Sequence, residues 1–296
     1  MTNSSKMHLF SPGHGGCPGC APSNTLITVT DTLGKDIIIV NATGCMEITS
    51  SQYPQSAWRV PYFHSLFQNS ASVATGVSRA LKAQGNDHTR VVVIAGDGAT
   101  YDIGFGAISG MLDRREDVIY VCYDNELYAN TGVQKSSATP YGAATTTTLE
   151  GKVHHGNEDE KKPVVEVAAA HGIPYAANAS IAFLADLKLK LRKAQKIRGP
   201  SFIVVNTPCA LGAGFDGGIS MQVARLTVQS RLWNLFEIEG GKYKLNYNPK
   251  PPKPVQDALF LQKRFKHLHQ QQGIVAHIQK RADENFERLL KKCSQP

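Results

Sequence analysis

The residues of this chain best suited to chemistry are a Gly-Asp-Gly run at positions 96–98 and a later amide side chain. The Gly-Asp-Gly run directly follows the apolar run 91–95, and Asn125 follows the next apolar run, 28 residues after Asp97. Glycines let a backbone turn tightly and approach phosphate oxygens, and Mg²⁺ accepts carboxylate and carbonyl oxygens as ligands. The pattern therefore predicts a site that holds a divalent metal on a diphosphate group.

The two apolar runs explain how these side chains would meet. Residues 91–95 are apolar without alternation, and residues 118–123 are similar. Such runs are typical of strands buried inside a parallel sheet, and ligands bind where these strands end. A Gly-Asp-Gly turn by itself is common in α/β proteins, so the prediction of a metal–diphosphate site depends largely on Asn125 at the end of the next strand. The pair resembles the diphosphate-binding motif of thiamine diphosphate enzymes, which runs from Gly-Asp-Gly to a downstream Asn.

Four of the six cysteines lie in predicted loops at strand ends, where cofactors bind: Cys17, Cys20, Cys45 and Cys209. The first two form Cys-Pro-Gly-Cys after a glycine-rich loop, a spacing that lets two thiolates bind one iron or zinc ion. From spacing alone, a structural zinc site and an iron–sulfur cluster both stay open. Cys122 lies inside an apolar run and is predicted to be a buried small hydrophobe, and Cys293 lies in a polar tail.

Length and composition indicate an α/β protein of the cytoplasm. At 296 residues the chain is long enough to bury a large core. It contains no apolar stretch of about 18 residues that would span a membrane, and residues 1–16 lack the apolar core of a signal peptide. Six cysteines are too few for a disulfide scaffold in a chain of this size. We therefore expect a cytoplasmic protein without a membrane span.

The elements that would position these residues alternate between strands and helices. Apolar runs predict strands near residues 26–30, 37–40, 91–95, 118–123 and 201–205. Helices are predicted over 69–83, with Asn69 as the cap, and over 186–198. The charged segment 154–162 is predicted to be a solvated loop. The expected fold is a mostly parallel sheet with helices on both faces and a helical C-terminal extension.

The basic character of the chain belongs to its C-terminal part. From Gly241 onward there are 12 Lys and Arg against 4 Asp and Glu, and this surplus of 8 equals the net charge of the whole chain, +8. Prolines at 249–254 mark a linker, and helices are predicted over 255–268 and 274–290. Aromatic residues are not interleaved as stacking platforms, so we expect no nucleic-acid binding. A contact with partner subunits is the better prediction.

Several long motifs in the correct order resemble the thiamine-diphosphate-binding β subunit of the 2-oxoacid:ferredoxin oxidoreductases, specifically the pyruvate type. The resemblance covers nearly the whole chain and implies the thiamine-diphosphate-binding fold in a domain of residues 1–230, followed by an extension, 231–296, for subunit contacts. The motifs are Pro12–Cys20, Gly44–Glu47, Tyr53–Trp58, His64–Asn69, Gly96–Gly104, Tyr123–Gly132, Ser137–Thr148 and Pro254–Leu268. Ala21 and Pro22 depart from the family pattern, so the thiamine contact that some members make there is not expected here.

The resemblance also implies roles for individual residues. The thiolates of a [4Fe–4S] cluster match Cys17, Cys20, Cys45 and Cys209. The side-chain ligands of Mg²⁺ match Asp97 and Asn125, and a backbone carbonyl ligand matches Leu127. Other thiamine diphosphate contacts match Gly44, Cys45, Gly96, Gly98, Ala99 and the turn from Asn125 to Asn130, and the amide of Asn130 matches the catalytic residue that faces the substrate. The glutamate that activates the cofactor in this family belongs to a partner subunit.

The implied reaction is the reversible oxidative decarboxylation of pyruvate with coenzyme A, which gives acetyl-CoA and CO₂ and passes electrons through [4Fe–4S] to ferredoxin. The implied partners are α, γ and ferredoxin-like δ subunits, separate or fused. The basic side chains Lys263, Arg264 and Lys266 are a candidate contact for ferredoxin or coenzyme A. Other 2-oxoacids, such as oxalate or an arylglyoxylate, stay open as substrates. A non-oxidative thiamine enzyme and a zinc-stapled scaffold without catalysis are the alternatives of other classes.

Overall fold

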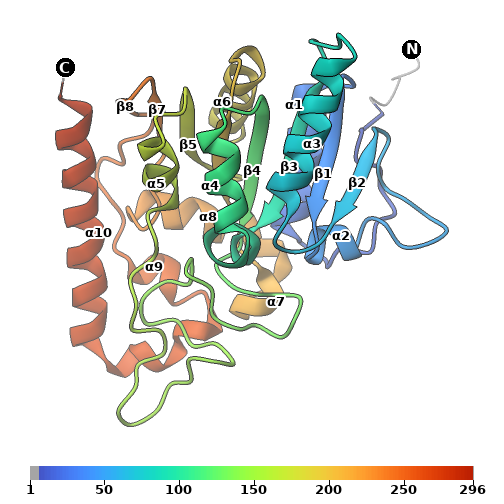
Figure 1. The fold of residues 1–296 in the computed structure, drawn as a ribbon. Coiled ribbons are helices and arrows are strands. Elements are labelled where there is room, and N and C mark those ends of the chain that lie inside the picture. Colours follow the sequence, from blue (N-terminus) through green and yellow to red (C-terminus); the bar gives the residue numbers. More distant parts are fainter. Residues whose placement is uncertain (1–6, 296) are drawn as a thin grey trace, which may run out of the picture.

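Eight strands form one sheet within residues 7–295, the part of the chain that the computed structural model describes (Figure 1). Their order across the sheet is β2-β1-β3-β4-β6-β5-β7-β8. The first six are parallel, whereas β7 pairs antiparallel with β5 and β8 with β7. The strands are β1 (Ile37–Ala42), β2 (Tyr62–Ser65), β3 (Arg90–Gly96), β4 (Val118–Asp124), β5 (Tyr175–Ser180), β6 (Ser201–Asn206), β7 (Phe236–Glu239) and β8 (Lys242–Leu245).

Helices cover both faces of the sheet, which confirms the expected fold class (Figure 1). Helices α3, α4 and α5 lie on one face, and α1 and α6 lie on the other. None of the described helices is both long enough and apolar enough to cross a membrane. The helices are α1 (Ala21–Leu33), α2 (Cys45–Ile48), α3 (Ser70–Ala83), α4 (Phe105–Asp113), α5 (Val164–Ala170), α6 (Leu184–Lys196), α7 (Ala210–Ala213), α8 (Ser220–Gln229), α9 (Gln256–Leu259) and α10 (Gln272–Cys293).

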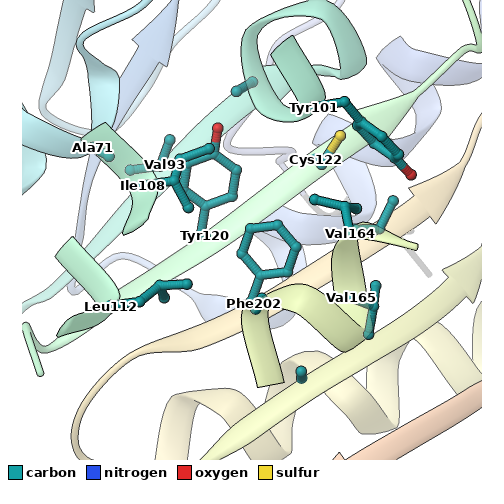
Figure 2. Packing of buried hydrophobic residues seen from close by; sticks show 14 of the residues in the cluster. Ala71, Val93, Tyr101, Ile108, Leu112, Tyr120, Cys122, Val164, Val165 and Phe202 are labelled. Atoms are coloured by element: carbon teal, nitrogen blue, oxygen red, sulfur yellow. The ribbon is translucent and has the colours of Figure 1, made fainter. Parts of the chain in front are cut away.

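The alternation of side chains along the central strands divides the core into two layers. Val91 and Val93 face the layer under α3 and α4, whereas Val92 and Ile94 face the opposite layer. Figure 2 shows the first layer, where Tyr120 stacks on Phe202 with ring centroids 5.2 Å apart. Burial on both faces explains why these strands are apolar throughout. The strands predicted near 37–40, 91–95, 118–123 and 201–205 are thus confirmed.

The strand predicted near residues 26–30 is wrong, because this segment belongs to helix α1. Pro22 lies in the first turn of α1, where a missing N–H costs nothing. Four threonine hydroxyls of α1 donate to the carbonyl four residues earlier, so the polar groups of this β-branched segment are satisfied inside a helix: Thr25, Thr28, Thr30 and Thr32. The helix packs on α6. Tertiary burial has overridden the local preference for a strand.

Two other predicted helices hold with changes at their ends. Helix α3 begins at Ser70, but the side chain of Asn69 makes no capping hydrogen bond and its Oδ1 is buried without a partner among the described residues. The helix predicted over 186–198 is α6.

Cys122 is fully buried in β4, as predicted.

The C-terminal part extends the sheet before it becomes helical. Strands β7 and β8 add to the β5 edge, and α10 runs beside them (Figure 1). The helix predicted over 274–290 is α10, whereas the one predicted over 255–268 is divided into α9 and the 3₁₀ segment Lys263–Gln270. These pieces share a small apolar core with Ala143. A boundary at residue 230 between two units stays a prediction.

Candidate active site

Most of the predicted site residues lie at or shortly after the carboxyl ends of the parallel strands β1, β3, β4 and β6. The prediction that all four cysteines follow strands is wrong for Cys17 and Cys20, because they precede helix α1. From β1 the chain proceeds outward to β2 on one side, and β3 and β4 lie on the other side. The strand order therefore reverses between β1 and β3. In open α/β sheets the crevice at such a reversal is where ligands bind. Residues Thr43–Cys45 follow β1, and Gly96 ends β3 with Asp97 and Gly98 directly after it, so both segments border this crevice.

An open cavity at this point brings together residues from three strand ends. It is lined by the turn after β1, the turn after β3 and the segment after β4, together with Phe67. Eight of the nine residues predicted to bind cofactor line it: Gly44, Cys45, Gly96, Asp97, Gly98, Asn125, Leu127 and Asn130. The ninth, Ala99, is buried in the core beneath the cavity. Asn130 is exposed, whereas Asp97 and Asn125 are buried.

Asp97 is a buried carboxyl group with few partners. Its side chain accepts a hydrogen bond of 2.5 Å from the hydroxyl of Ser136. Burial raises the pKa of Asp97 well above its ordinary value, and the nearby Asp124 carboxylate raises it further. Lys161 and the Ser136 hydrogen bond oppose this shift. A bound cation would stabilise the ionised form, so the carboxyl group fits a metal ligand.

The segment after β4 forms a tight turn that presents Asn125 and Leu127 to the cavity. Asp124 Oδ1 accepts from the backbone N–H of Glu126 at 3.0 Å, and Asn125 Oδ1 accepts from that of Leu127 at 3.2 Å. Glu126 has a φ of 69°, which only some residue types adopt readily. No hydrogen bond to the Leu127 carbonyl is found within residues 7–295. This carbonyl is therefore free to accept a ligand, as a metal-binding role requires.

Two glycines of the cavity are required by the side chains packed against them. A Cβ on Gly98 would lie 2.2 Å from the Tyr128 ring, and a Cβ on Gly44 would lie 3.0 Å from the Tyr123 hydroxyl. Gly44 also has a φ of 154°, inside the region that L residues avoid. The Tyr128 hydroxyl donates to Asp102 at 3.0 Å, which holds its ring in place. The backbone can thus approach a bound phosphate closely at both turns.

Of the four predicted cysteine ligands, Cys45 lines this cavity, and the other three lie near enough to affect its pKa. Burial raises the pKa of Cys45 to about 12, and the thiols of Cys209, Cys20 and Cys17 add to the shift. Burial also raises the pKa of Cys209, although the Gly212 N–H, 3.3 Å from its sulfur, opposes the shift. Bound metal would favour the thiolate over the thiol at such positions.

Close backbone packing fixes the Cys17–Cys20 loop against the segment that follows Cys209. A Cβ on Gly19 would lie 2.2 Å from the Gly217 carbonyl oxygen, so no other residue fits without a shift. The Ser220 hydroxyl donates to the Gly19 carbonyl at 2.7 Å. Within the described part of the chain, no three His, Cys, Asp or Glu side chains are grouped as ligands of a metal ion.

Several side chains at the site were not among the predicted residues. Ser136 reaches Asp97 from a loop, and Lys161 reaches Asp124 at 2.9 Å. Lys161 belongs to segment 154–162, which is predicted to be a solvated loop. This prediction is wrong for Lys161, because its side chain is partly buried and forms ion pairs with Asp124 and Glu126. Four of the other eight residues of that segment are exposed, as predicted, whereas Gly156 and Asn157 are buried. Neither Ser136 nor Lys161 lies at a strand end, so no pattern in the sequence indicates its place.

Comparison with known proteins identifies the family. A family model described as the C-terminal TPP binding domain of thiamine pyrophosphate enzymes matches residues 42–205. The chain is 46% identical over 275 residues to pyruvate synthase subunit PorB of Methanothermobacter thermautotrophicus, covering 93% of this chain and 95% of that protein. It is 45% identical over 289 residues to ketoisovalerate oxidoreductase subunit VorB of Pyrococcus furiosus, covering 95% and 92%.

A solved structure supports the fold. The 2-oxoglutarate:ferredoxin oxidoreductase from Magnetococcus marinus matches with a TM-score of 0.57 and 23% identity, over 74% of this chain and 79% of that one. At this identity the likeness concerns the architecture alone. The family model and the relatives that match over nearly the full length show that the chain belongs to the 2-oxoacid:ferredoxin oxidoreductase family, as the β subunit that carries the thiamine pyrophosphate-binding domain.

Proposed function

We propose that this chain, with its partner subunits, catalyses the reversible oxidative decarboxylation of pyruvate with coenzyme A, giving acetyl-CoA and CO₂ and passing electrons to ferredoxin. The observation that carries this proposal is the single cavity in which the turns after β1, β3 and β4 meet. The near full-length similarity to PorB supports pyruvate as the substrate. Membership in an oxidoreductase family favours this function over a scaffold without catalysis.

The residues around the cavity fit thiamine diphosphate and Mg²⁺. Asp97, Asn125 and the carbonyl of Leu127 would hold the metal, because they offer three oxygens at one strand-end crevice. The turns at Gly96–Gly98 and Gly44 would let the backbone contact the cofactor closely. When bound, thiamine diphosphate supplies an electron sink for the loss of CO₂ from a 2-oxoacid. The protein's own part is to hold the metal and to position the diphosphate.

The four cysteines would hold a [4Fe–4S] cluster, the role that the family resemblance implies for them. Cys17, Cys20 and Cys209 lie near enough to Cys45 to raise the pKa of its thiol. Cys45 lines the cofactor cavity as well, so a cluster held here would lie beside the site of decarboxylation. Such a cluster supplies one-electron transfer. The N–H of Gly212, which donates to the Cys209 sulfur, would stabilise negative charge on that sulfur.

The exposed rim of the cavity leaves room for substrate and partner subunits. Asn130 lies on this rim, where its amide can donate a hydrogen bond to a substrate oxygen. In the proposed assembly, α and γ subunits complete the site, a partner glutamate activates the cofactor, and a ferredoxin-like δ subunit receives the electrons. The open cavity and the subunit names of the relatives support this arrangement.

A branched 2-oxoacid is the second candidate substrate, because identity to VorB, 45%, nearly equals identity to PorB, 46%. The test is coenzyme A-dependent reduction of ferredoxin by the purified complex under anaerobic conditions. We expect the highest kcat/KM with pyruvate, compared in parallel with 2-ketoisovalerate, oxalate and an arylglyoxylate. A higher kcat/KM with another 2-oxoacid would overturn the pyruvate assignment. No reduction with any of them, at full cofactor content, would overturn the reaction itself.

A further inference from the structure

The turn that carries Asn125 and Leu127 is held from behind by charged side chains. Between them lies Glu126, whose φ of 69° is unfavourable for a glutamate. Its neighbour Asp124 accepts a hydrogen bond of 2.6 Å from the Tyr101 hydroxyl. Neither Glu126 nor Asp124 lines the cofactor cavity. Their carboxylates are therefore outside the cofactor cavity, and their partners are other side chains of this chain.

Two cations meet these carboxylates. Arg264 Nη2 lies 2.5 Å from Glu126 Oε2, and both side chains are buried. Lys161 Nζ lies 2.9 Å from Asp124 Oδ2 and 3.4 Å from Glu126 Oε1. Lys161 thus bridges the two acidic residues that flank Asn125, and Arg264 binds the second of them. In a buried setting, removal of one partner leaves the other charge uncompensated, so these pairs constrain the turn strongly.

Arg264 belongs to the C-terminal extension and is itself fixed. Its Nε donates to Gln262 Oε1 at 3.0 Å, and its backbone carbonyl accepts from the Ala144 N–H at 2.9 Å. The guanidinium is buried, so it is not available to an incoming ferredoxin or to coenzyme A. This corrects the sequence-based expectation for Arg264, whereas Lys263 and Lys266 are exposed.

We propose that Arg264 and Lys161 are positioning residues for the metal and cofactor. By holding Glu126 and Asp124, they keep the turn in the conformation that presents Asn125 Oδ1 and the Leu127 carbonyl to the cavity. The C-terminal extension would thus form part of the cofactor site of this chain, in addition to any contact with other subunits. The inference rests on the proposed function, because it takes the turn to be a Mg²⁺ site.

The test measures cofactor binding by the intact complex, stripped of thiamine diphosphate and Mg²⁺. Calorimetric titration gives the affinity for thiamine diphosphate at fixed Mg²⁺, and for Mg²⁺ at fixed thiamine diphosphate. For R264M we expect Mg²⁺ affinity to fall by about 10- to 100-fold, the usual effect of losing a residue that orients a ligand. R264K keeps the charge without the planar fork and should recover part of the loss. K266M, two residues away and exposed, is the matched control and should bind like the wild type.

A double-mutant comparison shows whether Arg264 acts through Glu126. If it does, E126Q/R264M binds no more weakly than E126Q alone. Thermal midpoints of the stripped complexes separate positioning from general stability. Unchanged Mg²⁺ affinity in R264M, with or without a lowered thermal midpoint, would overturn the inference. A wild-type complex that binds no thiamine diphosphate would instead overturn the proposed function, and the inference with it.

Discussion

The hydroxyl of Ser136 lies 2.5 Å from Asp97 Oδ2, although the two residues are 39 positions apart in the chain. This contact joins the long segment after β4 to the turn after β3. Ser136 is fixed in turn, because its N–H donates to Thr139 Oγ1 at 2.9 Å and its own oxygen accepts from the Ala138 N–H at 3.2 Å. The orientation of the proposed metal ligand Asp97 thus depends on a loop residue.

Replacing Ser136 by alanine should weaken cofactor binding. The S136A variant loses the hydrogen bond that the Ser136 hydroxyl donates to the buried Asp97 carboxyl, a loss of about 1 to 3 kcal/mol. We expect the affinity of the stripped complex for Mg²⁺ and thiamine diphosphate to fall about 5- to 100-fold, measured by calorimetric titration. The neighbouring S137A is the control, because the Ser137 hydroxyl makes no hydrogen bond among the described residues. Equal affinities in the two variants would contradict this role.

A methyl group at position 98 should disrupt the cavity. In G98A the new Cβ would lie 2.2 Å from the Tyr128 ring, so either the ring or the turn after β3 must move. We expect loss of bound thiamine diphosphate, measured as thiamine content after purification. The double variant G98A/Y128A removes the obstructing ring and should recover part of the binding. G106A, where a Cβ meets nothing within 4 Å, should retain full content. A G98A complex with full thiamine content would show that the close approach is not needed.

Replacing one cysteine should separate the two proposed cofactors. In C209S the cluster loses a thiolate ligand, so we expect a loss of iron, sulfide and visible absorption from this chain. Cys209 does not line the cofactor cavity, and thiamine diphosphate should therefore stay bound. The measurement is iron, sulfide and thiamine analysis under anaerobic conditions, with C293S as the control at the far end of α10. Unchanged iron content in C209S would remove this residue from the ligand set.

The stability of the sheet edge should depend on pH through Glu237. Burial raises the pKa of this carboxyl group, but hydrogen bonds from Lys193 and Tyr175 outweigh burial and leave the pKa below its ordinary value of 4.5. Because the folded-state pKa is the lower one, its contribution is present above pH 4.5 and is lost as the pH falls through the folded-state value. E237Q should lower the thermal midpoint at pH 7, and this difference should shrink toward pH 3. A difference that is the same at both pH values would contradict the assignment.

The central strands and the strand-end ligands are predictable because their signals are local. Asp97 and Asn125 each follow an uninterrupted apolar run, which is typical of a buried parallel strand. The helix α1 is not predictable in this way, because its β-branched run favours a strand in isolation and becomes helical through packing on α6. Strand β5 is rich in alanine and lacks the β-branched signature, so it was missed.

The side chains that hold the turn after β4 in place could not be predicted from the sequence, for a different reason. Lys161 lies in a charged segment whose composition indicates solvent, and Arg264 lies in a basic tail. Each becomes buried or partly buried only because a loop and the C-terminal extension fold over the turn after β4. The ion pair between Glu126 and Arg264 joins positions 138 residues apart, so no local sequence pattern indicates it.

The most direct test of the account is thiamine, magnesium, iron and sulfide analysis of the complex purified without oxygen, for the wild type and for D97N. For the wild type we expect one thiamine diphosphate per copy of this chain and about four irons attributable to its cysteines. We expect D97N to lose thiamine diphosphate and magnesium but to keep the irons. A wild-type complex with zinc in place of iron, or with thiamine diphosphate bound equally well in D97N, would contradict the account.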